Sequence, residues 1–110
     1  HLRVSYCAHA RAIENHVYLA LAGACGNLPH TSTAEIHYAQ SGIYTPSDTS
    51  FDREAVAAEC TPNAEMVLIH DVDLDKLAHH KHFGTVRNWI DRSKDLYSVH
   101  YDDGAEKGTI

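Results

Sequence analysis

A chain of 110 residues is long enough for one domain, and its net charge of −6 disfavours nucleic acid as a partner, because phosphate binding needs an excess of Lys and Arg. Hydrophobic residues make up 44% and charged residues 22%, which is ordinary for a globular protein and argues against disorder. The longest apolar run, residues 17–25, is too short to span a bilayer, so we expect no membrane partner.

The first elements that the sequence predicts are a helix and a buried strand. Over residues 1–16, apolar side chains recur at three- and four-residue steps, which predicts a helix with one apolar face made of Val4, Cys7, Ala8, Ala12 and Ile13. The run VYLALAG, residues 17–23, predicts a fully buried strand. Glycines, a proline and a Ser/Thr cluster then predict a loop over 23–33.

Three further strands and a short helix follow. Alternation predicts a strand over 35–45, in which Gly42 marks a bulge or a close backbone approach. Residues 46–52 predict a turn-rich connector, and 53–60 with 66–72 predict a hairpin through TPNAE. Asp73 is a predicted N-cap and Gly84 a predicted end of a helix whose inner stripe is Leu74, Leu77 and Ala78.

Residues 85–110 read as a polar tail. Its apolar side chains are predicted to anchor it: Val86, Trp89, Ile90, Leu96 and Tyr97. We expect residues 1–98 to belong to one domain and 99–110 to be a mobile tail. The order of helix, four strands, short helix and tail predicts an α/β fold of the layered α+β kind. One face of its sheet stays bare unless another layer covers it.

The three cysteines give no catalytic signal. They form no close pair, which favours a reducing, cytoplasmic setting over a disulfide framework. Cys25 ends the predicted buried strand without a charged neighbour, so a buried thiol is favoured over a nucleophile that recruits His30 or His37. Cys7 and Cys60 are predicted to be core residues.

Metal and cofactor motifs are also weak. His79, His80 and His82 lack the i, i+4 spacing of metal ligands on a helix, and we interpret them as a solvated helix end. The stretch HDVDLD, residues 70–75, lacks the glycine and closing Glu of a calcium loop. There is no glycine-rich nucleotide loop and no GxSxG motif, so we expect no metal and no cofactor.

Four ordered matches give the chain a resemblance to a known family. They are HARAIENHVYLALAGACGN (9–27), the set Tyr38, Ala39, Ser41, Ile43 and Pro46, AECTPNAEMVLIHDVDLDKL (58–77), and RNWIDRSKDLY (87–97). Together they resemble the carbon–nitrogen hydrolases, the nitrilase superfamily, over residues 3–97. The resemblance implies half of an α-β-β-α sandwich, and 87–97 are similar to a branch sometimes joined to an acetyltransferase domain.

The family hydrolyses or condenses non-peptide C–N bonds with a Glu base, a Lys that stabilises the tetrahedral intermediate and a Cys that forms a thioester. All three precede the family's RAxEN helix, and this chain begins at that helix, so the resemblance implies that it holds no catalytic residue. Neither Cys7 nor Cys25 matches the family nucleophile, and Ala39 replaces the family's glycine. The resemblance implies that the strand-end loop with Ala24, Cys25 and Asn27 lies where the family's sheet opens towards its active site. These three residues and Ser41 are the candidate pocket residues. Structural roles are predicted for three residues of the first helix: Arg11 and Glu14, spaced i, i+3 for either a surface ion pair or contact with another layer, and Asn15 at the helix end.

The chain start at His1, inside helix-like sequence, is typical of a cut piece. We therefore expect a fragment of an amidase-like hydrolase, inactive alone, whose intact parent acts on a small amide-type substrate. Its expected partners are further copies of itself or the missing half of the same domain. The alternative is a non-catalytic interaction or assembly module that completes a sandwich with a partner chain, and a weaker rival is an enzyme built on Cys25.

Overall fold

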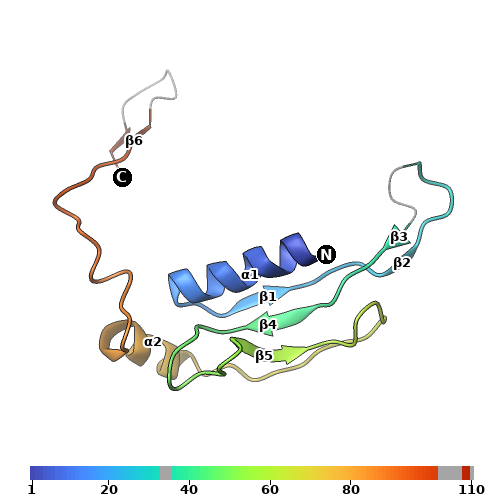
Figure 1. The fold of residues 1–110 in the computed structure, drawn as a ribbon, viewed down its shortest axis with the longest axis horizontal. Helices are drawn as coiled ribbons and strands as arrows, with labels where there is room; N and C mark the ends of the chain where they lie inside the picture. The colour runs from blue at the N-terminus through green and yellow to red at the C-terminus, as the bar shows by residue number, and fades with distance from the viewer. Residues whose placement is uncertain (33–35, 102–107, 110) are drawn as a thin grey trace.

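A computed structural model describes residues 1–32, 36–101 and 108–109 (Figure 1). Within these residues, two helices combine with small antiparallel sheets, which confirms the predicted mixed α/β class. In chain order the elements are α1 (Leu2–Asn15), β1 (Leu19–Leu21), β2 (Gly26–Asn27), β3 (Ile36–His37), β4 (Gly42–Tyr44), β5 (Val56–Glu59), α2 (Leu74–Phe83), β6 (His100–Tyr101) and β7 (Gly108–Thr109).

The centre of the molecule is a three-stranded antiparallel sheet in the order β1-β4-β5, with α1 packed against it (Figure 1). Ala8 and Ala12 of α1 meet the fully buried ring of Tyr44 in β4. Leu19, Leu21 and Val56 pack around this group. Because the two helical residues are alanines, the helix axis can approach the sheet closely, and the core is correspondingly small.

Among the described residues, no helix or strand packs on the other face of this sheet, as the element order predicts. Ala20 pairs with Ile43, and Ile43 pairs with Ala58, so these three side chains share one face. Strand alternation puts that face away from α1. Ala20 is exposed, so the prediction of a fully buried first strand is wrong: a helix covers only one side of β1.

The molecule as a whole exposes more surface than a closed domain of its mass. Its accessible surface is 8633 Å², whereas about 6,000 Å² is typical of a folded monomer of this size. Its radius of gyration is 18.4 Å, against about 13 Å for a compact domain of this length.

One predicted loop and one predicted strand differ from the structure. The predicted loop over 23–33 contains β2, which pairs with β3 through Gly26 and His37. The predicted strand over 35–45 is divided into β3 and β4; Glu35, at its start, lies outside the described residues. The close approach predicted at Gly42 is confirmed, because a Cβ there would lie 3.1 Å from Tyr44 Oη, and the register of β4 against β5 shifts at the next residue.

The predicted hairpin of 53–60 with 66–72 is wrong in its second half. Asn63 has a left-handed φ of 55° and donates its N–H to Ala39 O at 2.8 Å. The turn is therefore hydrogen-bonded to the segment between β3 and β4, and it does not lead into a strand that pairs with β5. Residues 63–73 then run on without strand pairing. Val67 and Ile69 in this segment are 82% and 87% exposed.

The ends of α2 agree with the sequence, but its buried face does not. Asp73 Oδ1 accepts a hydrogen bond from Lys76 N at 2.8 Å, and Gly84 N donates to His80 O at 2.9 Å, which confirms both predicted ends. Leu74 is 64% exposed and Ala78 is also exposed, whereas His80 is buried at 8%. Leu77 of the predicted apolar stripe is half-buried, so the stripe is wrong at Leu74 and Ala78 only. The solvated interpretation of His80 is also wrong, because His80 docks α2 through polar contacts.

Those contacts form a group that we call the Asp48 cluster: Asp48, Thr49, Ser50, His80 and Thr85. His80 Nε2 lies 2.5 Å from Ser50 Oγ, and His80 Nδ1 lies 3.4 Å from Asp48 Oδ2. Asp48 Oδ1 accepts from Thr85 Oγ1 and from Thr49 N, both at 2.7 Å. These hydrogen bonds, that from Thr85 first, lower the pKa of Asp48 to about 2. The cluster joins the turn after β4 to the end of α2.

Burial separates the cysteines. Cys60 is buried, as predicted, but Cys7 is exposed, so its assignment to the core is wrong. The sheet contacts only a narrow stripe of α1, formed by Ala8 and Ala12, and Cys7 lies outside this stripe. Val4 and Ile13, predicted on the same apolar face, are exposed as well.

The tail leaves the sheet without docking on it (Figure 1). Every predicted anchor in 85–97 is exposed, so that prediction is wrong. The Arg92 guanidinium carbon lies 3.6 Å from the centroid of the Trp89 ring. The Trp89 ring therefore packs within the tail and not on the core. Of the predicted mobile tail 99–110, residues 102–107 and 110 lie outside the described part of the chain.

Candidate functional site

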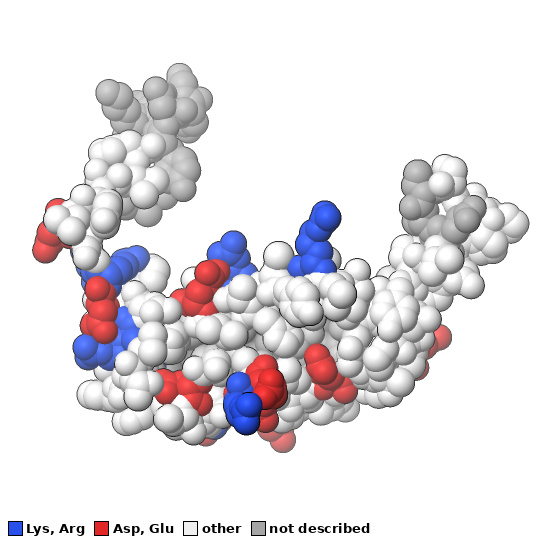
Figure 2. Space-filling model, viewed as in Figure 1, with Lys and Arg blue, Asp and Glu red and all other residues white. Residues whose placement is uncertain are grey.

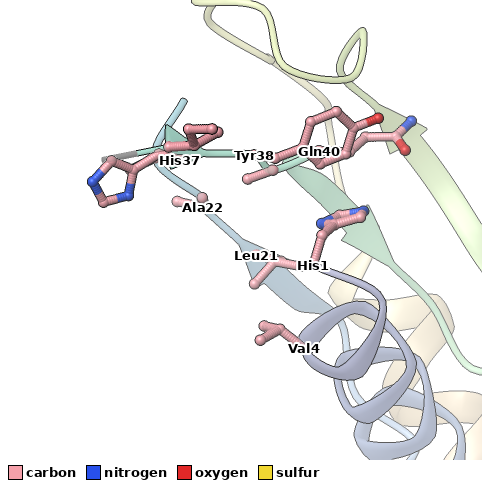
Figure 3. Close-up of a pocket in the computed structure, with 11 residues that line it drawn as sticks. His1, Val4, Leu21, Ala22, His37, Tyr38 and Gln40 are labelled. Atoms are coloured by element: carbon pink, nitrogen blue, oxygen red, sulfur yellow. The ribbon is translucent and has the colours of Figure 1, made fainter. Parts of the chain in front are cut away.

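The main candidate site is a pocket beside the start of α1, which we call the α1-end pocket (Figure 3). It has a volume of about 310 Å³ and lies where β1 leads towards β2 and where β3 leads into β4. Its walls come from the helix start, from residues 21–24 and from residues 36–40. Three segments that are distant in sequence therefore meet at this one hollow.

The walls are mostly apolar, with a few polar groups. Val4, Leu21 and Ala22 form one side (Figure 3). Tyr38 and Gln40 come from the opposite strand connection, and the His1 ring meets the Tyr38 ring edge-on with centroids 5.7 Å apart. Such a lining favours a small, largely uncharged ligand that is oriented by a few hydrogen bonds.

The polar side chains of Gln40 and His37 lie at different ends of the pocket. Gln40 Nε2 donates to Cys60 O at 3.0 Å, which fixes this side chain against the strand end. His37 Nε2 is buried and has no hydrogen-bond partner among the described residues. Figure 3 shows His37 at the far end of the pocket from His1 and Gln40. The pocket therefore carries polar atoms at both ends and an apolar middle.

The backbone of the pocket floor depends on a close contact. Gly23 N donates to Ser41 Oγ at 3.0 Å. A Cβ on Gly23 would overlap the Cβ of Ala39. Glycine at 23 therefore allows the two connections to pass each other, even though position 39 holds an alanine.

The four sequence-predicted pocket residues lie in different places. Ala24 lines the α1-end pocket, and Ser41 supports its floor through the bond to Gly23. Cys25 and Asn27 do not line it: Cys25 is half-buried beyond the pocket and Asn27 is exposed in β2. The structure thus brings two of the four to one site.

The residues given a structural role lie at the other end of α1. Arg11 forms an exposed ion pair with Glu14, one of the two arrangements that their spacing allows, and Asn15 Nδ2 donates to Arg11 O at 3.0 Å. Asn88 Nδ2 donates to Glu14 O at 3.1 Å, which fastens the tail to this helix end. A helix of 14 residues is about 21 Å long, so this group is remote from the pocket.

Sequence reasoning missed His1, Tyr38 and Gln40 as pocket residues. Tyr38 and Gln40 have the same parity in the stretch IHYAQS, and this alternation was the signal that could have placed them on one side. Nothing in the sequence links His1 to Tyr38.

In the ranges that the structure describes, no group of three His, Cys, Asp or Glu side chains is placed to hold a metal ion. Neither α1 nor α2 has the length and apolar character needed to cross a bilayer.

Comparison with known proteins gives a relative that is named as a hydrolase. The chain is similar to the Bacillus subtilis (strain 168) protein named "Probable hydrolase YhcX", with 50% identity over 101 residues. The match covers 92% of this chain and 20% of the relative, so the chain spans about a fifth of the length of the curated relative that it matches. No protein-family description matches the chain, and no solved structure is detectably similar.

Proposed function

We propose that this chain is a C-terminal part of the catalytic domain of a carbon–nitrogen hydrolase of the nitrilase superfamily. The observation that carries the proposal is the agreement between the four ordered family-like motifs and the 50% identity to part of a protein named as a hydrolase. The parent would cleave a small amide-type substrate, and it would act as a homo-oligomer or through the other half of the same domain.

The bare sheet face supports this proposal. In an α-β-β-α sandwich, each sheet has a helix layer on one face and the second sheet on the other. Here α1 covers one face, while the row of Ala20, Ile43 and Ala58 on the other face consists of small or apolar side chains. That composition suits sheet-on-sheet packing at about 10 Å.

In the parent, the reacting groups would be the Glu, Lys and Cys of the family, which this chain does not contribute. The Cys sulfur would attack the amide carbon, the C–N bond would break with release of the amine, and water would hydrolyse the thioester. The role of this chain would be binding: the apolar middle of the α1-end pocket would hold the substituent of the amide, with Tyr38 and Gln40 available for hydrogen bonds.

The first test is the mass of the protein in its native source. A mass well above 12.2 kDa supports the proposal and calls for an assay of ammonia release from short aliphatic amides by the intact protein. In that assay Ala24→Trp, which fills the pocket, should raise KM or abolish turnover. Ala10→Trp on the exposed side of α1 is the matched control and should leave turnover unchanged. Robust thiol-dependent amide hydrolysis by the 110-residue chain alone would contradict the proposal.

A second candidate function is a non-catalytic module that completes a sandwich with a partner chain. The observation that favours it is the large exposed surface, with Val67, Ile69 and other apolar side chains uncovered. Figure 2 shows that most of the viewed face is uncharged, with Lys, Arg, Asp and Glu scattered over it. A native mass near 12.2 kDa together with a stable complex would support this function. A monomer with strongly protected amides in dilute solution would contradict it.

A further inference from the structure

The Asp48 cluster contains a serine, a histidine and an aspartate in the connectivity of a hydrolytic triad. Ser50 Oγ lies 2.5 Å from His80 Nε2, and His80 Nδ1 lies 3.4 Å from Asp48 Oδ2. The two nitrogens of one imidazole thus face the hydroxyl and the carboxylate on opposite sides, which is the arrangement by which such a triad is recognised. The α1-end pocket uses none of these residues.

The burial of the three groups matches their roles. The side chain of Asp48 is 2% exposed and that of His80 is 11% exposed, whereas Ser50 is exposed. A triad needs an enclosed carboxylate and imidazole and a hydroxyl that a substrate can reach. The Phe51 ring meets the His80 ring edge-on at 5.1 Å and covers it from one side.

The carboxylate is held in its ionised form and in place. Its Oδ1 accepts from Thr85 Oγ1 and Thr49 N, and these bonds keep the pKa of Asp48 near 2. Its Oδ2 and His80 Nδ1 face each other, and neither atom forms a hydrogen bond within the described ranges. A separation of 3.4 Å is longer than a good hydrogen bond, and catalytic contacts are often long before substrate binds.

The turn also supplies a donor for a developing oxyanion. Thr49 N donates to Asp48 Oδ1 and Phe51 N donates to Asp48 O, so both neighbouring amides are occupied. Among the described residues, no hydrogen bond is formed by the Ser50 N–H. An amide of the nucleophile itself is a recognised part of an oxyanion hole.

We propose that Ser50, His80 and Asp48 form a second, serine-based site that hydrolyses short-chain acyl esters. Ser50 Oγ attacks the ester carbon while His80 Nε2 takes the hydroxyl proton. The bond from that carbon to the leaving oxygen breaks, and His80 gives its proton to the departing alcohol. Water then attacks acyl-Ser50, His80 takes a proton from the water, and Ser50 leaves with that proton, so ester and water become acid and alcohol. Asp48 is a positioning residue that stays ionised throughout.

The substrate class follows from the openness of the site. Ser50 stands in an exposed turn, and the neighbouring Phe51 ring, which packs edge-on against His80, offers an apolar surface there. Small, uncharged esters reach such a hydroxyl without a deep pocket. Esters suit it better than amides, because an alcohol leaves with less proton assistance than an amine.

The test is covalent labelling of the 110-residue chain with a fluorophosphonate, mapped by peptide mass spectrometry, together with hydrolysis of 4-nitrophenyl acetate. We expect the label on Ser50 and none on Ser47, the matched exposed serine of the same segment. Ser50→Ala should lower hydrolysis to background, and Ser47→Ala should leave it unchanged. His80→Gln should lower kcat by about 100-fold, the usual contribution of a general base. Asp48→Asn should lower kcat with little change in KM.

Mapping the label on the unmodified chain keeps the result independent of any variant that fails to fold, and circular dichroism monitors the helices of each variant. Equal labelling of Ser47 and Ser50, or hydrolysis that persists in Ser50→Ala, would overturn the proposal. The Ser50–His80 contact would then serve only to fasten α2. Because the site needs no Glu–Lys–Cys set, its failure leaves the proposed amide hydrolysis by the parent untouched.

Discussion

Replacement of Tyr44 by phenylalanine should stabilise this protein. The Tyr44 side chain is fully buried against Ala8 and Ala12, and its hydroxyl has no hydrogen-bond partner among the described residues. A buried hydroxyl without a partner costs about 1–3 kcal/mol, so its removal should raise the free energy of unfolding by about 1 kcal/mol. The melting temperature should rise by roughly 4–8 °C in a domain of this size. Tyr44→Ala, by contrast, should cost about 3–5 kcal/mol.

The assay is urea unfolding followed by circular dichroism at the helical minimum, with thermal melts as a second measure. Tyr97→Phe is the control, because Tyr97 is exposed in the tail and its change should stay within about 0.5 kcal/mol. A clear loss of stability in Tyr44→Phe would refute the reasoning. It would mean that the hydroxyl makes a bond in solution that the fold does not show.

Three other outcomes follow from the structure. The folded pKa of Asp48, about 2, lies below its ordinary value of 3.8, so its contribution to stability is present above pH 3.8 and lost as the pH falls towards 2. When the pH is lowered from 3.8 to about 2, the urea midpoint of unfolding should fall in the wild type and change less in Asp48→Asn. Gly84→Ala should destabilise by about 1–3 kcal/mol in thermal melts, because its Cβ would lie 2.6 Å from His80 O and 2.8 Å from Asp48 Oδ2. A thiol reagent followed by mass spectrometry should modify exposed Cys7 in the native protein long before buried Cys60, and equal rates would contradict the burial described here.

The local parts of the fold are those that the sequence predicts well. Asp73 and Gly84 delimit α2 because capping chemistry depends only on nearby backbone groups. The sequence also predicts the extent of α1 well, because the helix ends at Asn15, one residue before the predicted end. Gly42 is a further case, since its missing Cβ makes room for Tyr44 two residues later.

What the sequence did not predict depends on contacts between distant segments. The second strand of the hairpin fails because Asn63 bonds to Ala39, 24 positions earlier, and no local pattern records that bond. His80 looked like a solvated helix end because its partners, Asp48 and Ser50, lie about 30 residues away. The α1-end pocket has the same origin, since His1 meets Tyr38 only after the sheet has formed.

The pairing order of the central sheet also has a consequence for the folding pathway. The chain turns from α1 into β1 at His16, which takes a left-handed φ of 51°, and β1, β4 and β5 then add to the sheet in the order in which they occur in the chain. Such a sheet can assemble progressively during synthesis, without waiting for a distant strand. Val67 and Ile69 emerge after it, uncovered, and at that stage the nascent chain presents the kind of apolar segment that molecular chaperones bind.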